Sequence, residues 1–309
     1  MSPNSTPETN IVTGAYGYMG KYITRRLLAQ GKQVKTLTNH PHRENEFGDK
    51  VQALPFNFDR YYDLVASLQG ATTLYNTYWV RFNYGATRFD QGIENTRTLF
   101  RAAKEAGIKR FVHTSILKPD PNSPLPYYKG KGQLEDALKQ SGMSYAILQP
   151  TVVFGLEDVL INNIAWLVRR FPIFGVPGNG EYQLQPIYVE DIADIAVAAG
   201  QSMTNQTIET IGPEIYSFNT LVKLIANKLH RRVKIFHAPP KLALLMSQFI
   251  SLFVRDVILT QEEVDGLLAN LLVSANPPTG RTHLSDWLEQ NADSVGKKYA
   301  SEVGRHFRK

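Results

Sequence analysis

Cysteine is absent from the 309 residues of the chain. Without a thiol there is no disulfide, no thiolate zinc site and no cysteine nucleophile. Long apolar runs are absent too: the nearest candidate, Leu242 to Leu259, is interrupted by polar and charged residues, and a membrane-spanning helix needs about 20 apolar residues. Met1 to Asn10 lacks the basic and apolar segments of a secretory signal. We therefore expect a cytoplasmic protein.

Charge of one sign is not concentrated anywhere except at the short basic end, Arg305 to Lys309. The net charge is +6, but no basic helix carries interleaved aromatic residues, so a nucleic-acid partner is not indicated. A solvated surface that attracts an anionic cofactor accounts for the charge. No cluster of metal-ligating residues is evident, and we predict no metal site.

Glycine is concentrated in the stretch Ile11 to Gly20, which reads IVTGAYGYMG. Gly14 suits a tight turn after the apolar strand, Gly17 allows close approach of a pyrophosphate, and Gly20 allows the next helix to pack on the sheet. The helix expected from Tyr18 to Gln30 would point its N-terminal N–H groups and positive dipole end at phosphates. The pattern predicts a dinucleotide site; a glycine-rich turn that binds nothing is the alternative.

Apolar segments alternate with helical patterns through the first half of the chain. Strands are expected at 11–13, 33–38, 51–58, 72–77, 110–115 and 145–148, and helices at 18–30, 61–69, 84–106 and 131–140. A further helix is expected to start near Asp191, within the segment 187–200. Short connections between alternating strands and helices predict an α/β fold, a Rossmann-type doubly wound parallel sheet with ligands at the carboxyl ends of its strands.

Beyond Pro150 the alternation loosens, and we expect a smaller, mostly helical C-terminal substrate annex. Phe171 to Gly180 is dense in proline and glycine and predicts an ordered loop, whereas Arg232 to Phe236 predicts a short strand. The NAD(P)-binding Rossmann domain is assigned to 1–155 and 186–211, and the annex to 156–185 and 212–309.

The end of the second strand favours NADP over NAD. Thr38 to Arg43 contains no acid that would bind a free ribose 2'-hydroxyl, and Arg43 could instead pair with a 2'-phosphate. The alternative is that these are only solvated loop residues, and NAD then remains open. Asn57 and Phe58, after the third strand, suit the edge and face of an adenine, although a polar residue at a strand end is unremarkable.

Tyr127 and Lys131 lie four residues apart at the start of an expected helix, so both project from one face. A neighbouring ammonium favours the phenolate and lets the tyrosine exchange a proton with a substrate oxygen. Such a pair by itself usually marks a surface helix. Here it follows a glycine turn and a strand that ends in Thr114 and Ser115, which favours acid/base chemistry.

Several motifs together carry a family resemblance. They are TGAYGYMG at 13–20, IENTRTLFRAA at 93–103, RFVHTS at 110–115, YYKGK at 127–131 and LQPTVVFG at 148–155. With them the chain resembles the short-chain dehydrogenase/reductase superfamily, in its extended or atypical branch. Within that branch it is similar to the NmrA-like proteins and to the dinucleotide-binding accessory subunit of respiratory complex I.

The resemblance implies Tyr127, Lys131 and Ser115 as catalytic residues, with Tyr127 as the acid/base. It also implies that Pro150, Thr151 and Val153 lie beside the nicotinamide. The full set of expected cofactor contacts is Gly14, Tyr16, Gly17, Tyr18, Met19, Gly20, Asn39, Arg43, Asn57, Phe58, Thr77, Lys131, Pro150, Thr151 and Val153.

Two positions depart from the family pattern. The carbonyl-polarising Ser or Thr usually sits one position past Ser115, where this chain has Ile116. Either Ser115 or Thr114 substitutes, or that help is missing, which would cost on the order of 2 to 4 kcal/mol. Gln149 stands where an arginine commonly precedes the proline.

An unusually aromatic segment, Tyr75 to Arg88, follows the fourth strand and predicts the substrate side. Expected substrate contacts are Trp79, Arg81, Tyr128 and Tyr182, with a packed lid as the alternative role for the segment. We expect Asn95 to support backbone between strands, His113 to be a satisfied core histidine, and Trp166 and Trp287 to serve packing.

These features predict an NADP-dependent oxidoreductase that moves hydride to or from a small, partly apolar carbonyl or polarised double bond. The alternative is a non-catalytic NADP(H)-binding scaffold or redox-sensing subunit. In that case Leu242 to Leu259 would dock a protein or membrane surface, or else be buried under the annex. A monomer or a homodimer is expected.

Overall fold

The computed structural model describes residues 8–80, 88–242, 245, 256 and 260–306. The chain divides into two compact units, which are Met1–Gln149 with Ile192–Ile208 (unit 1) and Pro150–Asp191 with Glu209–Lys309 (unit 2). The chain crosses from one unit to the other after Gln149, Asp191 and Ile208. The sequence predicted these domain boundaries after residues 155, 185 and 211.

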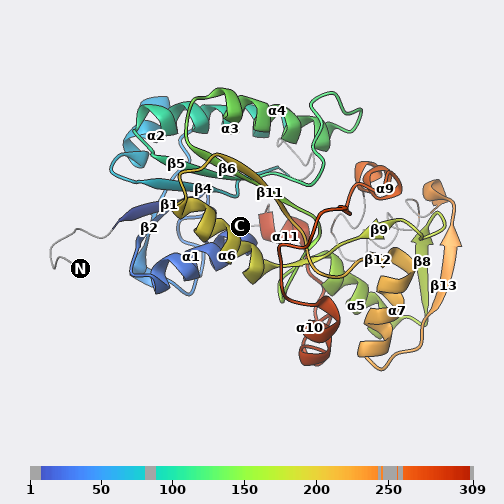
Figure 1. Cartoon of the computed structure of the whole chain (residues 1–309). Helices are drawn as coiled ribbons and strands as arrows, with labels where there is room; N and C mark the ends of the chain where they lie inside the picture. Colours follow the sequence, from blue (N-terminus) through green and yellow to red (C-terminus); the bar gives the residue numbers. More distant parts are fainter. Residues whose placement is uncertain (1–7, 81–87, 243–244, 246–255, 257–259, 307–309) are drawn as a thin grey trace. The chain divides into compact units, whose positions relative to one another are not determined.

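A seven-stranded sheet, in the order β11-β6-β5-β4-β1-β2-β3, forms the centre of the first unit (Figure 1). Its strands are β1 (Thr9–Thr13), β2 (Gln33–Leu37), β3 (Val51–Leu54), β4 (Thr73–Asn76), β5 (Arg110–Thr114), β6 (Tyr145–Pro150) and β11 (Gln206–Thr210). The pairings from β3 through β6 are all parallel. The expected doubly wound parallel sheet is therefore confirmed. β11 was not predicted, because its sequence QTIET has too few apolar residues to mark a buried strand.

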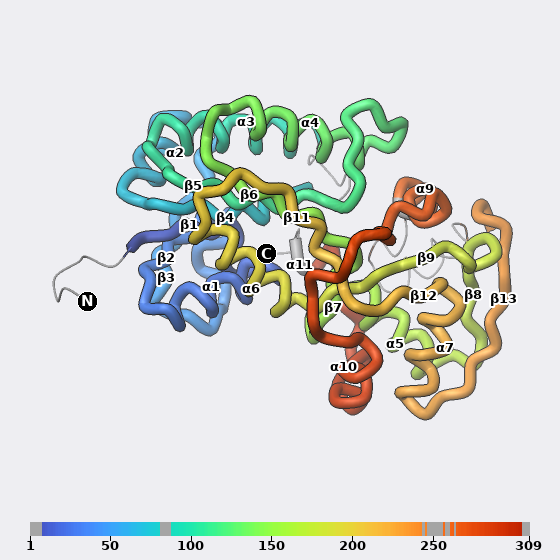
Figure 2. Tube along the Cα trace, viewed as in Figure 1, coloured from blue at the N-terminus to red at the C-terminus, as the bar shows by residue number. Residues whose placement is uncertain are grey.

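The strand order reverses between β1 and β4, and ligands of such sheets bind where the order reverses. Figures 1 and 2 show helices on both faces of the sheet. They are α1 (Tyr18–Ala29), α2 (Tyr61–Leu68), α3 (Phe89–Glu105), α4 (Pro126–Gln140) and α6 (Val189–Gln201), and a 3-10 turn, η1 (Gly48–Lys50), precedes β3. α1 and α6 are joined by an ion pair in which Arg26 Nε lies 2.7 Å from Asp194 Oδ1.

One core layer of the first unit lies between the sheet and α2, α3 and α4. Its fully buried members include Ile11, Leu74 and Phe111 from strands and Leu99 and Leu134 from helices. The long helix α3 ends where the sequence predicts, because Gly107 adopts a φ of 78°, a left-handed conformation that glycine tolerates best. The expected start of this helix, at Tyr84, lies outside the described residues.

The second unit combines helices with short strand pairs. Its helices are α5 (Leu160–Arg170), α7 (Phe218–Lys228), α9 (Gln261–Leu268), α10 (Leu284–Gln290) and α11 (Glu302–His306). Its strand pairs are β7 (Val153–Phe154) with β10 (Ile187–Tyr188), β9 (Gln183–Leu184) with β12 (Tyr216–Ser217), and β8 (Ile173–Pro177) with β13 (Lys234–Ala238). Trp287 is packed in its core, as expected, against Phe154.

One expectation for this unit is wrong. Within Phe171–Gly180, which predicted a loop, the structure has a strand, β8, paired in parallel with β13. Phe174 and Val176 are buried while Ile173 and Gly175 are exposed, so a two-residue period is present. Burial of the alternate side chains in the core outweighs the local signal of the prolines and glycines.

Within the described residues, no helix has the length and apolarity needed to cross a bilayer. In the same ranges, no group of three His, Asp or Glu side chains is placed to hold a metal ion.

Candidate functional site

The glycine turn after β1 is fixed by backbone geometry. Gly14 has a φ of 65°, and its N–H donates to the Leu37 carbonyl at 2.9 Å, which ties the turn to the end of β2. At Gly20 a Cβ would lie 2.3 Å from the Gly14 carbonyl oxygen, so α1 packs directly on the turn. At Gly17 a Cβ would lie 3.1 Å from the same oxygen, a tight contact inside the loop.

The N-terminus of α1 suits an anion. Its N-cap is Gly17, no side chain caps it, and its first turn contains no acidic residue. The helix dipole and the N–H groups of the first turn, Tyr18, Met19 and Gly20, are therefore not neutralised by a carboxylate of that turn. The Thr114 hydroxyl lies 3.6 Å from Met19 Sδ, which places the end of β5 beside this turn.

The loop after β2 presents the residues predicted to read the adenosine ribose. Asn39 and Arg43 are both exposed, and the Arg43 N–H donates to the His40 carbonyl at 3.2 Å, closing a turn. The hydroxyl of Tyr16, another predicted cofactor contact, already has a partner within the protein, because it donates to the Val51 carbonyl at 3.3 Å. Burial raises the pKa of Tyr16.

An aromatic cluster lies where the adenine was expected. Phe58 stacks on Phe56, with ring centroids 4.9 Å apart, and tilts against Tyr78 at 5.2 Å. Asn57 has a φ of 47°, and its carboxamide oxygen already accepts a 2.6 Å hydrogen bond from Arg60. Asn95 does not support the backbone between strands: its Nδ2 donates to the Tyr78 hydroxyl at 2.9 Å, so it tethers the cluster.

Sequence reasoning missed a chain of buried polar groups across β1, β4 and β5. The Thr13 hydroxyl donates to Asn76 Oδ1 at 3.0 Å, and Asn76 Nδ2 lies 3.0 Å from His113 Nδ1. Thr77 joins the chain because its hydroxyl donates to the Thr13 carbonyl at 2.6 Å. The signal was present as polar residues inside otherwise apolar strands.

His113 is a core residue, as expected, but it is only half satisfied. Its Nδ1 has a partner in Asn76, whereas its Nε2 is buried with no hydrogen-bond partner. Burial, together with the positive charge of Lys131, lowers the pKa of His113 well below its usual value. The imidazole is therefore neutral at physiological pH.

The predicted catalytic pair lies on α4. This helix begins at Pro126, so Tyr127 is in its first turn and Lys131 lies one turn later on the same face. Lys131 is 2% exposed, and its Nζ donates to the Thr114 carbonyl at 2.9 Å. Burial lowers the pKa of Lys131 to about 7. Near neutral pH the charged and the neutral forms of the Lys131 side chain are therefore both populated.

Trp79 joins this pair. Lys131 Nζ lies 4.2 Å from the centroid of the Trp79 ring, and the Tyr127 ring meets Trp79 edge-on at 5.5 Å. Tyr128, the next residue of α4, is buried, and burial followed by the charge of Tyr127 raises the pKa of its phenol.

The end of β5 carries the candidate for the third catalytic group. Ser115 is 3% exposed, and its N–H donates to the Leu148 carbonyl at 2.7 Å. Its Oγ is buried with no hydrogen-bond partner. Gln149, the second departure from the family pattern, is tied to α4 through a 2.8 Å hydrogen bond from its Nε2 to Glu135 Oε1.

Four of the predicted site residues belong to the second unit. Pro150 ends β6, the Thr151 hydroxyl donates to the Gln185 carbonyl, and Val153 pairs with Ile187. Tyr182 is a buried core residue whose hydroxyl has no partner, and burial raises its pKa.

Other predicted positions fall where little or nothing is described. Arg81 lies outside the described residues, as does most of Leu242 to Leu259. Within that range Leu242 and Leu245 are 43% and 51% exposed. Asp256 is buried, and its carboxylate accepts the N–H groups of Glu302 and Val303, both at 2.8 Å.

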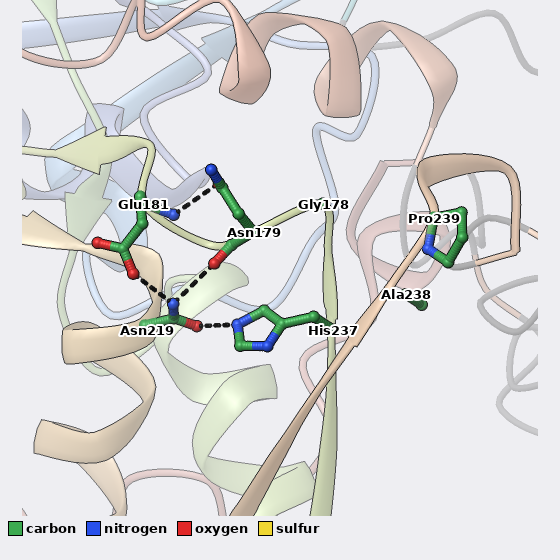
Figure 3. Close-up of a pocket in the computed structure, with 7 residues that line it drawn as sticks. All are labelled: Gly178, Asn179, Glu181, Asn219, His237, Ala238 and Pro239. Carbon is green, nitrogen blue, oxygen red and sulfur yellow. Dashed lines mark hydrogen bonds between the residues drawn. The ribbon is translucent and has the colours of Figure 1, made fainter.

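A cavity of about 590 Å³ lies in the second unit, and no predicted site residue lines it (Figure 3). Its wall is formed by Gly178, Asn179, Glu181, Asn219, His237, Ala238 and Pro239. Asn219 Nδ2 donates to the Asn179 carbonyl at 2.8 Å and to Glu181 Oε1 at 2.7 Å, and its Oδ1 lies 3.0 Å from His237 Nε2. These bonds brace the turn that follows β8.

Residues 14–158 match the family described as NAD(P)H-binding. The chain is 26% identical over 285 residues to the Arabidopsis thaliana protein named NADH dehydrogenase [ubiquinone] 1 alpha subcomplex subunit 9, mitochondrial. The aligned region covers 86% of this chain and 71% of that subunit. Related mitochondrial subunits of Neurospora crassa and Mus musculus are matched over 64% and 61% of their own length.

A second kind of relative is the photosystem II assembly factor Ycf39 of Guillardia theta, which is 26% identical over 79% of this chain and 77% of the factor. Among solved structures, a nucleoside-diphosphate-sugar epimerase from Staphylococcus aureus superposes with a TM-score of 0.74 at 16% identity, over 91% of this chain and 99% of the epimerase. At that identity the likeness shows the fold alone. The comparisons confirm the resemblance drawn from the motifs.

Proposed function

We propose that this chain, an atypical short-chain dehydrogenase/reductase with an NAD(P)-binding domain, is an oxidoreductase that prefers NADP(H) and acts on a small, partly apolar carbonyl or polarised double bond. The observation that carries the proposal is the Tyr127 and Lys131 pair, held on one face of α4 with Trp79 against both side chains. A solvated surface pair would not bury its lysine to 2% exposure.

The residues present fit a dinucleotide. The turn at Gly14 to Gly20 leads into an uncapped helix N-terminus, and the Ser115 hydroxyl at the end of β5 is buried without a partner. Phosphates would be held at the first turn of α1, the adenine beside the Phe58 cluster, and a ribose 2'-phosphate by Arg43. When bound, the nicotinamide supplies or accepts a hydride.

The chemistry of the protein's own groups follows from their protonation. In reduction the substrate carbon gains the hydride, and the substrate oxygen takes the Tyr127 hydroxyl proton, so that C=O becomes CH–OH. The phenolate left on Tyr127 is then reprotonated from water. Lys131 stabilises that phenolate when it is charged, and with a pKa of about 7 it exchanges its own proton near neutral pH.

The test of turnover is NADPH consumption with acetophenone, 2-cyclohexenone and a short-chain benzoquinone. Tyr127→Phe should lower kcat by at least 100-fold and leave NADPH binding intact, because it removes only the proton donor. Tyr62→Phe is the matched control, since Tyr62 lies in α2 and is 79% exposed. Equal turnover by wild type and Tyr127→Phe would remove the tyrosine from the reaction.

The cofactor preference has its own test. Arg43→Ala should weaken NADPH binding about 10-fold and leave NADH binding unchanged, because only NADPH carries the 2'-phosphate. Arg101→Ala, at an exposed position in α3, removes the same charge elsewhere. The preference is wrong if NADH binds wild type as tightly as NADPH does.

A non-catalytic NADP(H)-binding scaffold or redox-sensing subunit is the second candidate. Two observations favour it: relatives are named as a subunit of a respiratory enzyme and as an assembly factor, and Ile116 stands where the family has its carbonyl-polarising hydroxyl. In that case Tyr127→Phe would preserve NADPH binding and every cellular phenotype. A pull-down of a stable assembly by both wild type and Tyr127→Phe would support this role.

A further inference from the structure

The indole of Trp79 is an unused hydrogen-bond donor beside the proposed acid/base pair. Its Nε1 is buried and has no hydrogen-bond partner. A buried donor without a partner costs about 1–3 kcal/mol, so such a group in a folded protein calls for a ligand or an ordered water. Position 116, where the family resemblance implies a carbonyl-polarising hydroxyl, is isoleucine in this chain.

The ring of Trp79 is held by α4 and α3. Lys131 Nζ lies 4.2 Å from the ring centroid, and a Cβ added at Gly130 would lie 3.3 Å from Trp79 Cη2. The rings of Tyr127 and Phe89 lie 5.5 Å and 6.3 Å from it. The indole N–H is therefore fixed relative to the Tyr127 ring before any substrate arrives.

We propose that the N–H of Trp79 donates a hydrogen bond to the substrate oxygen and replaces the hydroxyl that is missing at position 116. This inference rests on the proposed oxidoreductase function and names the feature its substrate must have. An indole N–H donates and never accepts, so the substrate atom beside Tyr127 must be an acceptor, such as a ketone, enone or quinone oxygen. A fixed donor at that oxygen stabilises the negative charge that develops there.

Ser115 is the rival donor, because its Oγ is also buried without a partner. The contacts favour Trp79, because within the part of the chain that the structure describes its ring meets both Tyr127 and Lys131. Ser115→Ala therefore belongs in the experiment as a direct competitor of Trp79→Phe.

The experiment measures steady-state kinetics with acetophenone, 2-cyclohexenone and the benzoquinone for wild type, Trp79→Phe, Trp79→His and Ser115→Ala. Trp79→Phe keeps an aromatic ring and loses the N–H, so kcat should fall about 100-fold while NADPH binding stays unchanged. Trp79→His keeps a ring N–H and should recover part of that loss. Trp166→Phe removes an indole in α5 and is the control.

A second readout does not depend on turnover. The chain has three tryptophans, so the ¹⁵N-labelled protein gives three indole N–H resonances, and Trp79→Phe assigns one of them. In the unreactive mixture of NADP⁺ with the best carbonyl substrate, the Trp79 resonance should move downfield as its N–H gains an acceptor. The resonances of Trp166 and Trp287 should not move.

The outcomes separate this inference from the proposed function. Absence of turnover by wild type with every compound would overturn the oxidoreductase, and the role of Trp79 with it. Normal turnover by wild type and by Trp79→Phe, or a Trp79 resonance that does not move, would overturn the inference alone. A loss confined to Ser115→Ala would assign the donor to Ser115 instead.

Discussion

Replacement of Lys131 by methionine should stabilise the folded protein, and the gain should shrink as the pH rises. The side chain is 2% exposed, and burial lowers the pKa of its ammonium from 10.5 to about 7. Below pH 7 the folded protein holds a buried charge, and the full penalty is present. Above pH 7 the folded state releases the proton while the unfolded chain keeps it up to about pH 10.5, so the penalty is relieved.

The magnitude follows from that pH window. Between the two pKa values the unfolded state binds one more proton than the folded state, so stability rises by about 1.4 kcal/mol per pH unit. From pH 7 to pH 9 the wild type should gain about 2 kcal/mol relative to Lys131→Met. Methionine is unbranched and apolar, so it fills the space beside the Trp79 ring without a charge.

The assay is urea unfolding at pH 7, 8 and 9, followed by Trp79 fluorescence in a Trp166→Phe/Trp287→Phe background so that the signal comes from the first unit. Lys129→Met, at an exposed position in α4, controls for the loss of a positive charge. A stability difference between wild type and Lys131→Met that stays constant from pH 7 to pH 9 would refute the reasoning, because it would show that Lys131 keeps its proton in the folded state.

Three further predictions concern stability. Gly20→Ala places a Cβ 2.3 Å from the Gly14 carbonyl oxygen, so it should lower the free energy of unfolding by about 1–3 kcal/mol and weaken NADPH binding. Gly175→Ala, where a Cβ meets nothing within 4 Å, should change neither quantity. Calorimetry measures both, and an unchanged NADPH affinity of Gly20→Ala would contradict the role of the loop. Asp158→Ala removes the side-chain oxygen that accepts the Ile161 N–H at 2.6 Å, so the free energy of unfolding in urea should fall by about 2 kcal/mol. Asp158→Asn keeps an acceptor oxygen and should recover part of that stability. An unchanged stability of Asp158→Ala would mean that α5 does not depend on this hydrogen bond. Arg110→Met removes three hydrogen bonds, of 3.0 Å to the Ala199 carbonyl, 2.8 Å to Ser144 Oγ and 2.9 Å to the Thr204 carbonyl. It should lower the free energy of unfolding by about 3 kcal/mol, whereas Arg101→Met, at an exposed position, should not change it. Equal effects of the two variants would refute this prediction.

The sequence by itself determined the features that depend on neighbouring residues. Gly14 and Gly20 are needed by a turn only a few residues long, and Gly107 ends its helix through its own backbone conformation. The alternation of strands and helices is likewise a local pattern, and it led to the correct parallel sheet. The four-residue spacing of Tyr127 and Lys131 placed both on one helix face because helical geometry fixes it.

Only the tertiary structure decided what depends on packing between distant segments. β8 formed within a segment rich in proline and glycine because β13, far away in sequence, pairs with it. Asn95 bonds to Tyr78, and Asn76 to His113, through contacts that no local pattern encodes. The pKa of Lys131 and the unpartnered N–H of Trp79 follow from desolvation, which is a property of the packed surroundings and not of the residue type.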